Sequence, residues 1–229
     1  MRTHTKSSIR GAQPASVSLD LVICAPAGRQ LSVLLVPSAE GSREKWTLPW
    51  GWSVAGVQPD DGALKIATTA LGAKPSWITQ VVATGDEKRH PAGASISVGY
   101  VAVTAARERA LGEGAVWFPS QHLPAMAPRH VALVAAAAEA LRVRLDTAPI
   151  AFRLLPPTFT LSELQEVYEL LLGRSVHKAS FRRSLQAVWL VEPTDEWRSE
   201  GRGRPAQLFR YAPRKRRGNR RGVRFDLLD

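Results

Sequence analysis

The chain has 229 residues, enough to bury the core of one large domain or two modest ones. Its 31 Lys and Arg against 20 Asp and Glu give a net charge of +11 and a pI near 10.6, which favours a polyanionic partner. Its only cysteine, Cys24, excludes an internal disulfide, and no apolar run reaches the roughly 18 residues of a membrane span. We therefore expect a cytoplasmic protein with no membrane association.

The first segments predict a disordered start followed by a hairpin. Residues 1–14 are polar and lack the apolar core of a secretory signal. From Ser16 the residues alternate, with apolar side chains on one face and Ser18 and Asp20 on the other. This alternation predicts a half-buried strand, and Leu31 to Val36 predicts its hairpin partner.

A Leu-Pro turn and one amphipathic helix follow. The segment 46–73 reads WTLPWGWSVAGVQPDDGALKIATTALGA, in which a helix begins after Pro59 and ends at Gly72. Asp60 and Asp61 lie in its first turn, where we expect them to cap the helix.

The rest of the first domain predicts strands and a second helix. Strands are expected at Ile78 to Thr84, Ala94 to Val103 and Ala115 to Phe118, and an alanine-rich helix at Pro128 to Leu145. A turn-rich loop between the first two of these strands carries Arg89 and His90, which could bind a phosphate or lie in a surface turn. His130 has no evident partner and is assigned a structural role. Residues 15–147 thus predict one α+β domain.

A second, smaller domain is predicted at residues 158–212, after a linker at 148–157 that ends in Pro156-Pro157. Thr160 and Glu163 form a capping box that opens a helix, and Gly173 closes it. A second helix follows after a short gap, and a polar hairpin comes next. This order is typical of a winged helix-turn-helix domain.

The second helix and the hairpin carry the candidate DNA-binding residues. Arginine can grip guanine or hold phosphates, and the wing arginines favour phosphate or minor-groove contacts. The candidates are Lys178, Ser180, Arg182, Arg183, Gln186, Arg202 and Arg204. Eleven of the residues from Arg198 to Arg224 are Lys or Arg and one is acidic, so the tail at 213–229 is expected to add affinity that depends steeply on salt.

The segment from Gly51 to Gly72 resembles a Nudix box, whose pattern places glutamates and one arginine at fixed intervals. In this chain those positions hold Val57, Lys65, Ile66, Thr69 and Ala70. Magnesium prefers carboxylate oxygens, which none of these side chains offers. We therefore expect no catalytic residues, no metal site, no cofactor and no hydrolysis.

A wider resemblance covers residues 15–211. FTLSELQEVYELLLGRSVHKASFRRSLQAVWLVEP followed by RGRPAQLFRY resembles the winged helix of the Nudix-related transcriptional regulators of the NrtR family, and DLVIC, LPWGW and PIAFRLLP fit the same family. The resemblance implies a Nudix-like α/β/α sandwich with a mixed sheet, a homodimer that represses nicotinamide-cofactor genes on double-stranded DNA, and release of DNA by ADP-ribose or a similar nucleotide. It also implies that Arg182 and Arg183 face the operator.

The first domain departs from the family pattern in two places. RHPAG stands at residues 89–93 where the family has Arg-Asp-Pro-Arg-Gly, and Trp50 stands where a Leu-Pro-Gly-Gly turn would have its first glycine. The candidate ligand-binding residues are Trp50, Trp52, Lys65, Arg89 and His90. Trp50 and Trp52 could stack on an adenine or fill the space.

Two further functions stay open on sequence alone. One is a Nudix hydrolase with displaced carboxylates such as Glu108 or Glu113. The other is a constitutive nucleic-acid-binding protein without a ligand. In the regulator itself, the first domain could sense a nucleotide-like metabolite or serve only for dimerisation.

Overall fold

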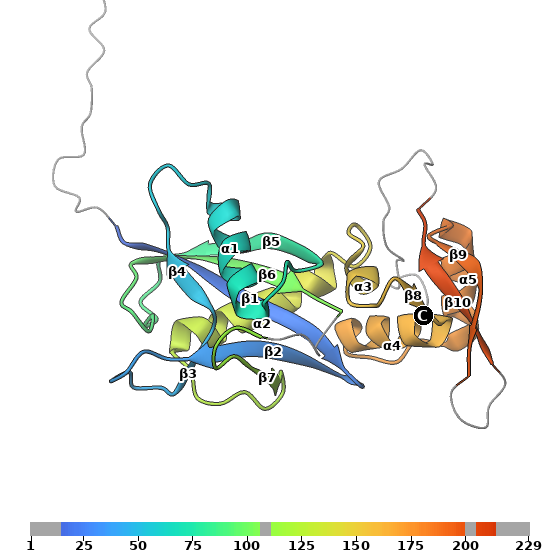
Figure 1. The fold of residues 1–229 in the computed structure, drawn as a ribbon, viewed down its shortest axis with the longest axis horizontal. Coiled ribbons are helices and arrows are strands. Elements are labelled where there is room, and N and C mark those ends of the chain that lie inside the picture. The colour runs from blue at the N-terminus through green and yellow to red at the C-terminus, as the bar shows by residue number, and fades with distance from the viewer. Residues whose placement is uncertain (1–14, 106–110, 200–204, 214–229) are drawn as a thin grey trace, which may run out of the picture.

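The computed structural model describes residues 15–105, 111–199 and 205–213, and it is built from a Nudix-like domain and a winged helix (Figure 1). The first domain has a seven-stranded sheet in which β1 runs parallel to β6 and antiparallel to β2 and β4. Its strands are β1 (Val17–Ala27), β2 (Gln30–Pro37), β3 (Trp46–Thr47), β4 (Trp50–Trp52), β5 (Trp77–Thr84), β6 (Ile96–Val103) and β7 (Val116–Pro119).

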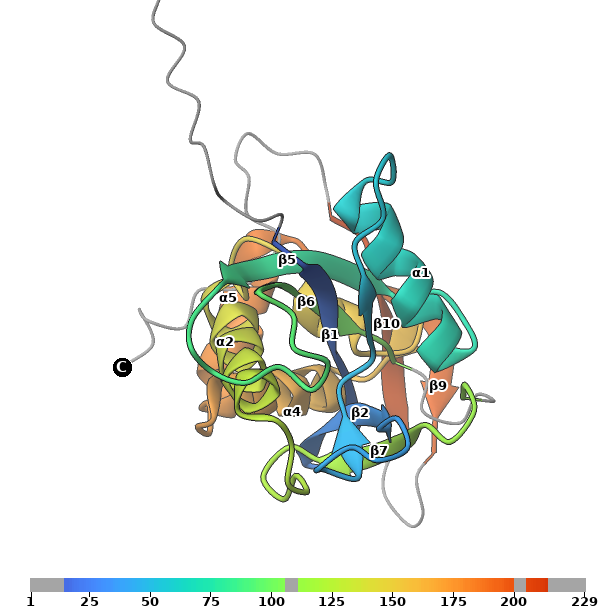
Figure 2. The same cartoon turned by 90° about the vertical axis from the view of Figure 1, so that its left-hand side faces the viewer.

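Two helices cover this sheet, α1 (Pro59–Leu71) on one face and α2 (Pro128–Val143) on the other, as Figure 2 shows. Ala63, Ala67 and Leu71 of α1 pack on Leu19, Leu21 and other residues of the sheet. Leu133, Ala137 and Leu141 of α2 pack on the opposite face. The predicted α/β/α sandwich with a mixed sheet is confirmed.

The prediction that β1 is half-buried is wrong. Ser18 and Asp20 are both 0% exposed, as fully buried as Leu21 on the other face. The reason is tertiary, because β1 lies at the centre of the sheet and α2 covers the face that carries these polar side chains.

The start of α1 also differs from the prediction. Gln58 is the N-cap residue, and no side chain caps the helix by a hydrogen bond. Asp60 instead accepts a hydrogen bond of 2.7 Å from the hydroxyl of Tyr100 on β6. Asp60 therefore ties the helix to the sheet.

The second domain has the winged-helix order. Its elements are β8 (Thr158–Phe159), α4 (Leu161–Leu172), α5 (Lys178–Val188), β9 (Val191–Arg198) and β10 (Ala206–Tyr211). The predicted capping box is present, because the Thr160 hydroxyl accepts from the Glu163 N–H and the Glu163 carboxylate accepts from the Thr160 N–H. Gly173 ends α4 at φ 69°, in the left-handed region that favours glycine.

The segment predicted as a linker is part of the packed structure. It contains α3 (Ile150–Arg153), whose Ile150 and Phe152 are buried. One apolar cluster runs from Leu141 of α2 through these residues to Leu164 and Tyr168 of α4. The two domains thus share a core. No helix in the described parts of the chain has the length and apolarity required to cross a membrane.

Candidate ligand pocket and nucleic-acid interface

The degenerate Nudix box faces a cavity of about 550 Å³. Four of the box positions line it from α1: Lys65, Ile66, Thr69 and Ala70. Pro49 and Trp50 line it from the turn before the helix. A cavity large enough for a ligand is therefore present beside the box, although the residues that would bind magnesium are replaced.

Gly112 allows one wall of this cavity to lie close against α1. The loop at Gly112 lies against the last turn of α1, and its N–H donates to the carbonyl of Ala70 at 2.9 Å. A Cβ at Gly112 would lie 2.5 Å from the carbonyl oxygen of Thr69, so a larger residue would push the loop away. Glu113, the next residue, is the single carboxylate among the described residues of the lining.

Magnesium does not fit this lining. Ile66 and Ala70 are apolar and Thr69 offers only a hydroxyl, so Glu113 would have no second carboxylate beside it. Glu108, the other displaced carboxylate considered from the sequence, lies outside the described residues. A hard divalent cation needs more oxygen ligands than this set supplies.

The five predicted ligand-binding residues do not all meet at the cavity. Trp50 and Lys65 line it. Trp52 is 46% exposed beside Trp50, with the two ring centroids 5.3 Å apart. Arg89 forms an ion pair with Glu44, so its charge is already matched.

The backbone at His90 begins the expected surface turn, in which the Gly93 N–H donates to the His90 carbonyl at 3.1 Å, but the His90 side chain points inward and is not available to a phosphate at the surface. Its side chain is 0% exposed and lies under Trp50, with the ring centroids 5.0 Å apart. His90 instead belongs to a buried polar network with Ser18, Asp20 and His130. In this network, Nε2 of His90 and Nε2 of His130 lie 3.0 and 2.8 Å from the same oxygen of Asp20, and the Ser18 hydroxyl donates to the other at 2.6 Å.

The backbone determines which nitrogen of each histidine carries the proton. Nδ1 of His90 accepts from the N–H groups of Ala92 and Ala94, at 3.1 and 3.3 Å. Nδ1 of His130 accepts from the N–H of Leu48 at 3.2 Å. A neutral ring that accepts at Nδ1 carries its proton on Nε2, so both histidines donate to Asp20.

The electrostatics agree with this assignment. Burial would raise the pKa of Asp20, but the hydrogen bonds from His130, His90 and Ser18 outweigh it and hold that pKa well below its usual range. Burial lowers the pKa of His130, and the attraction of Asp20 does not restore it. The lowered pKa favours a neutral His130 ring beside the Asp20 carboxylate.

These three residues form the one group of His, Cys, Asp or Glu in the described chain whose ligand atoms lie within 4.8 Å of one another. A metal bound at both Nε2 atoms would require the protons to move to Nδ1, where backbone N–H groups already point. The donor set thus fits a hydrogen-bond network better than a metal centre. Sequence reasoning missed it because its members are 70 and 110 residues apart along the chain.

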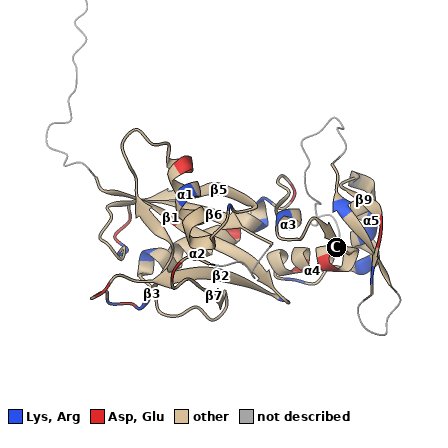
Figure 3. Ribbon diagram, in the orientation of Figure 1, with Lys and Arg blue, Asp and Glu red and all other residues tan. Residues whose placement is uncertain are grey.

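In the winged helix, α5 presents an exposed polar face, called here the recognition face: Lys178, Arg182, Arg183 and Gln186. Its apolar face is buried through Phe181 and Leu185, as predicted. Among the described residues, the four side chains of the recognition face make no ion pair or hydrogen bond, and Figure 3 shows the basic segments of α5 at the end of the molecule far from the sheet. Ser180, a further candidate, is half-buried on the same helix.

Strands β9 and β10 form the predicted wing, paired from Val191 with Tyr211 to Arg198 with Ala206. At the end of β9, a guanidinium nitrogen of Arg198 donates to the Glu163 carboxylate of α4 at 2.6 Å and ties the wing to that helix. The predicted contacts Arg202 and Arg204, and the tail from residue 214, lie outside the described residues.

The fold and these residues define a class, the transcription regulators that join a Nudix-like domain to a winged helix. The NrtR DNA-binding winged helix domain model matches residues 151–211. The "ADPR responsive transcriptional repressor NtrR" of Acinetobacter baylyi is 30% identical over 207 residues, which are 86% of this chain and 82% of that protein. The chain belongs to the NrtR family.

Solved structures agree with this assignment. NrtR of Shewanella oneidensis in complex with a 27mer DNA matches with a TM-score of 0.74 and 28% identity, over 86% of this chain and 94% of that one. A MutT/nudix family protein from Enterococcus faecalis shares the fold with a TM-score of 0.69 and 16% identity, over 90% of each chain.

Proposed function

We propose that this protein is a DNA-binding transcriptional repressor whose Nudix-like domain senses ADP-ribose or a related nucleotide and does not hydrolyse it. The observation that carries the proposal is the recognition face. Arg182 and Arg183 are exposed on the second helix of a helix-turn-helix and have no partner among the described residues. Exposed arginines at this position can reach base edges in the major groove. The Shewanella relative was solved on DNA, which supports the same role here.

The cavity beside the Nudix box supports the sensing role. Its volume of about 550 Å³ falls in the range of about 300–1,000 Å³ of small-molecule sites. Lys65 can hold a phosphate, and the Trp50 ring offers a surface on which an adenine can stack. The Acinetobacter relative responds to ADPR, so ADP-ribose is the first ligand to test.

Hydrolysis is not part of the proposal. Glu113 is the one carboxylate that the described lining contributes, which leaves a magnesium-dependent reaction without its ligands. Loss of nucleotide turnover on Glu113→Gln, in a protein that showed turnover, would instead support the displaced-carboxylate enzyme.

Coupling between the two sites can run through the shared core. His130 joins the buried network near the pocket to the first turn of α2, and Leu141 of the same helix packs in the cluster that holds Leu164 of α4. A change in the position of α2 would therefore reach the winged helix. We also propose that the protein acts as a homodimer, because a helix-turn-helix commonly reads two half-sites. We expect it to act in the cytoplasm.

The deciding experiment is a DNA-binding titration of the full chain against the promoter upstream of its own gene, at two salt concentrations, with and without ADP-ribose. Sequence-specific binding that ADP-ribose weakens is the expected result. Specific binding that ignores ADP-ribose would keep the repressor and reject this ligand. Weak binding that depends steeply on salt and not on sequence would reject the repressor.

A further inference from the structure

A second and larger cavity, of about 720 Å³, lies at the junction of the two domains. Each of three segments contributes one cation to its lining: Lys74 follows α1, Arg153 lies on α3 and Arg210 lies on β10. The sequence patterns singled out none of these residues. We call this cavity the junction site.

The junction site is positively charged. None of the described residues that line it is acidic. Within the described chain, Lys74 and Arg153 form no ion pair. Arg210 pairs with Glu192 at 3.3 Å, but its side chain is 63% exposed, and a pair this accessible is weak. Three exposed cations from different segments therefore line one cavity with little internal compensation, which gives this cavity a positive potential that favours an anion.

One wall of the site is aromatic. The rings of Phe152 and Tyr211 stack with centroids 4.4 Å apart and planes at 29°. Phe159 packs on Phe152 with centroids 5.9 Å apart, and Pro156 and Pro157 extend the apolar surface. Cations beside a flat apolar wall are the combination that recognises a phosphate attached to a planar ring.

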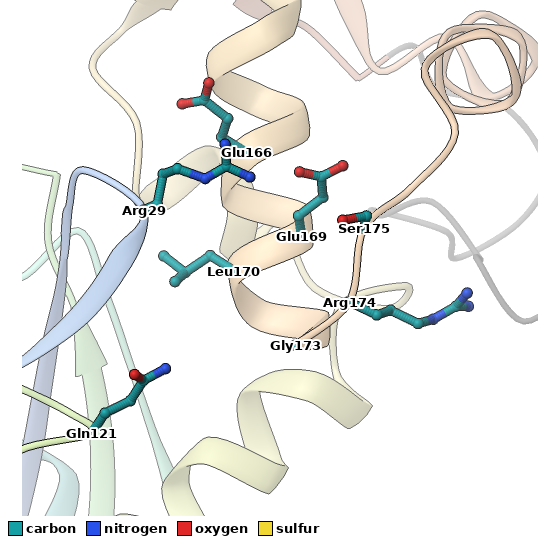
Figure 4. A pocket seen from close by; sticks show the side chains of 8 residues that line it. All are labelled: Arg29, Gln121, Glu166, Glu169, Leu170, Gly173, Arg174 and Ser175. Atoms are coloured by element: carbon teal, nitrogen blue, oxygen red, sulfur yellow. The ribbon is translucent and has the colours of Figure 1, made fainter.

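Another cavity at the domain junction provides a contrast. In this smaller space of about 250 Å³, Arg29 of the β1–β2 turn extends toward Glu166 of α4, as Figure 4 shows. Glu169 lies on the same helix face and accepts from the N–H of Val176 at 2.8 Å. Here two carboxylates balance the two arginines of the lining, so the cavity attracts no anion. Of these two cavities, the junction site alone has an excess of cations among its described lining residues.

We propose that the junction site binds a small phosphate-bearing ligand with a planar ring, of the mononucleotide class, as a second effector site separate from the Nudix-like pocket. Lys74 and Arg153 hold the phosphate, and the ring packs against Tyr211 and the prolines, where the buried Phe152 supports Tyr211 by stacking. Because the ligand contacts both domains, its binding stabilises their present arrangement. This site does not depend on the proposed function, since it can be measured without DNA.

The test is calorimetric titration of the full-length protein with AMP, with variants in the two cavities. The double variant Lys74→Gln/Arg153→Gln should weaken AMP binding at one site by about tenfold or more, because two charged contacts are lost. Lys65→Gln, in the Nudix-like pocket, should leave that site unchanged. Arg142→Gln is the control for the loss of a surface charge, since this arginine is exposed, pairs with Glu139 and does not line the junction site. An unchanged AMP titration in the double variant would overturn the proposal.

Three further probes separate the parts of the ligand and the source of the phosphate. Adenosine should bind at least about tenfold more weakly than AMP, and ribose 5-phosphate likewise, because each lacks one recognised part. Equal binding of adenosine would overturn the phosphate contact, and equal binding of ribose 5-phosphate would overturn the ring contact. If AMP does not bind and the double variant instead lowers the salt dependence of DNA binding, the cations serve the DNA backbone and the small-ligand site is rejected. Unfolding midpoints equal to that of the unmodified protein exclude misfolding of the variants.

Discussion

The buried polar network and the recognition face are both built from polar or charged side chains, but they differ in solvent exposure and in whether those side chains are paired. In the network, Asp20, His90 and His130 are at most 2% exposed and every nitrogen and oxygen considered has a partner. On the recognition face, Arg182 and Arg183 are exposed and have no partner in the described chain. The difference shows which polar groups build the protein and which remain available to another molecule.

This contrast has an energetic basis. A buried donor without an acceptor costs about 1–3 kcal/mol, so a network in the core must be complete. An exposed arginine costs almost nothing when it is unpaired, because water solvates it. Changes in the network should therefore alter folding, and changes in the recognition face should alter DNA binding.

The largest effect is expected from removing the centre of the network. Asp20→Ala leaves the Nε2–H groups of His90 and His130 without an acceptor, so the free energy of unfolding should fall by about 2–6 kcal/mol. Chemical denaturation measures this. Glu139→Ala, which removes a carboxylate from an exposed pair, should leave the free energy of unfolding almost unchanged. Equal effects of the two variants would contradict the distinction between buried and exposed carboxylates.

The next effect concerns the recognition face. Arg182→Ala and Arg183→Ala should each weaken specific DNA binding by about 1–3 kcal/mol if the side chains contact bases, with no change in the unfolding midpoint. Fluorescence anisotropy with operator DNA and with random DNA measures specific and non-specific binding. Arg142→Ala is the control, an arginine on α2 paired with Glu139. Equal losses on the two DNAs would make these residues phosphate contacts.

The network should also make stability depend on pH. The folded-state pKa of His130 lies below its ordinary value of 6.5, so the unfolded chain takes up a proton first as the pH falls. The free energy of unfolding should therefore decrease below pH 6.5, by up to about 1.4 kcal/mol per pH unit from this group. Asp20, whose pKa is also lowered, adds a second decrease below pH 3.8.

His130→Gln should remove the decrease that begins at pH 6.5, since glutamine can donate and accept but does not titrate. An NMR titration of the unmodified protein provides a second measurement that does not depend on the variant folding. At pH 6.5 the His130 ring should be mostly neutral, and a ring that is half or more protonated at that pH would contradict the assignment.

The smallest effect is expected at the wing. Arg198→Gln removes an ion pair to Glu163 whose side chains are 34% and 31% exposed, so stability should fall by only about 0.2–1 kcal/mol. Thermal unfolding measures the loss. The Glu163 carboxylate should keep its bond to the Thr160 N–H, because that bond uses its other oxygen. A loss of stability as large as that of Asp20→Ala would show that this part-exposed pair contributes as much as the buried network.

The winged helix could be predicted almost completely because its signals are local. The capping box at Thr160 and Glu163 spans one helical turn, and Gly173 marks the end of the same helix. The spacing of Phe181 and Leu185 determined which face of α5 is buried, and hence that Arg182 and Arg183 are exposed. The replaced carboxylates of the Nudix box were also visible in the sequence, at Ile66, Thr69 and Ala70.

The features that only the tertiary structure revealed are formed by residues far apart in the chain. The alternation around Ser18 and Asp20 is the pattern of a half-exposed strand, and only the packing of α2 on that face buries it. His90 and His130 look unrelated in sequence, yet both reach one oxygen of Asp20. The junction site likewise exists because α1, α3 and β10 meet. Local patterns specify helices, strands and their exposed faces, whereas a site assembled from distant segments is determined by how those elements pack.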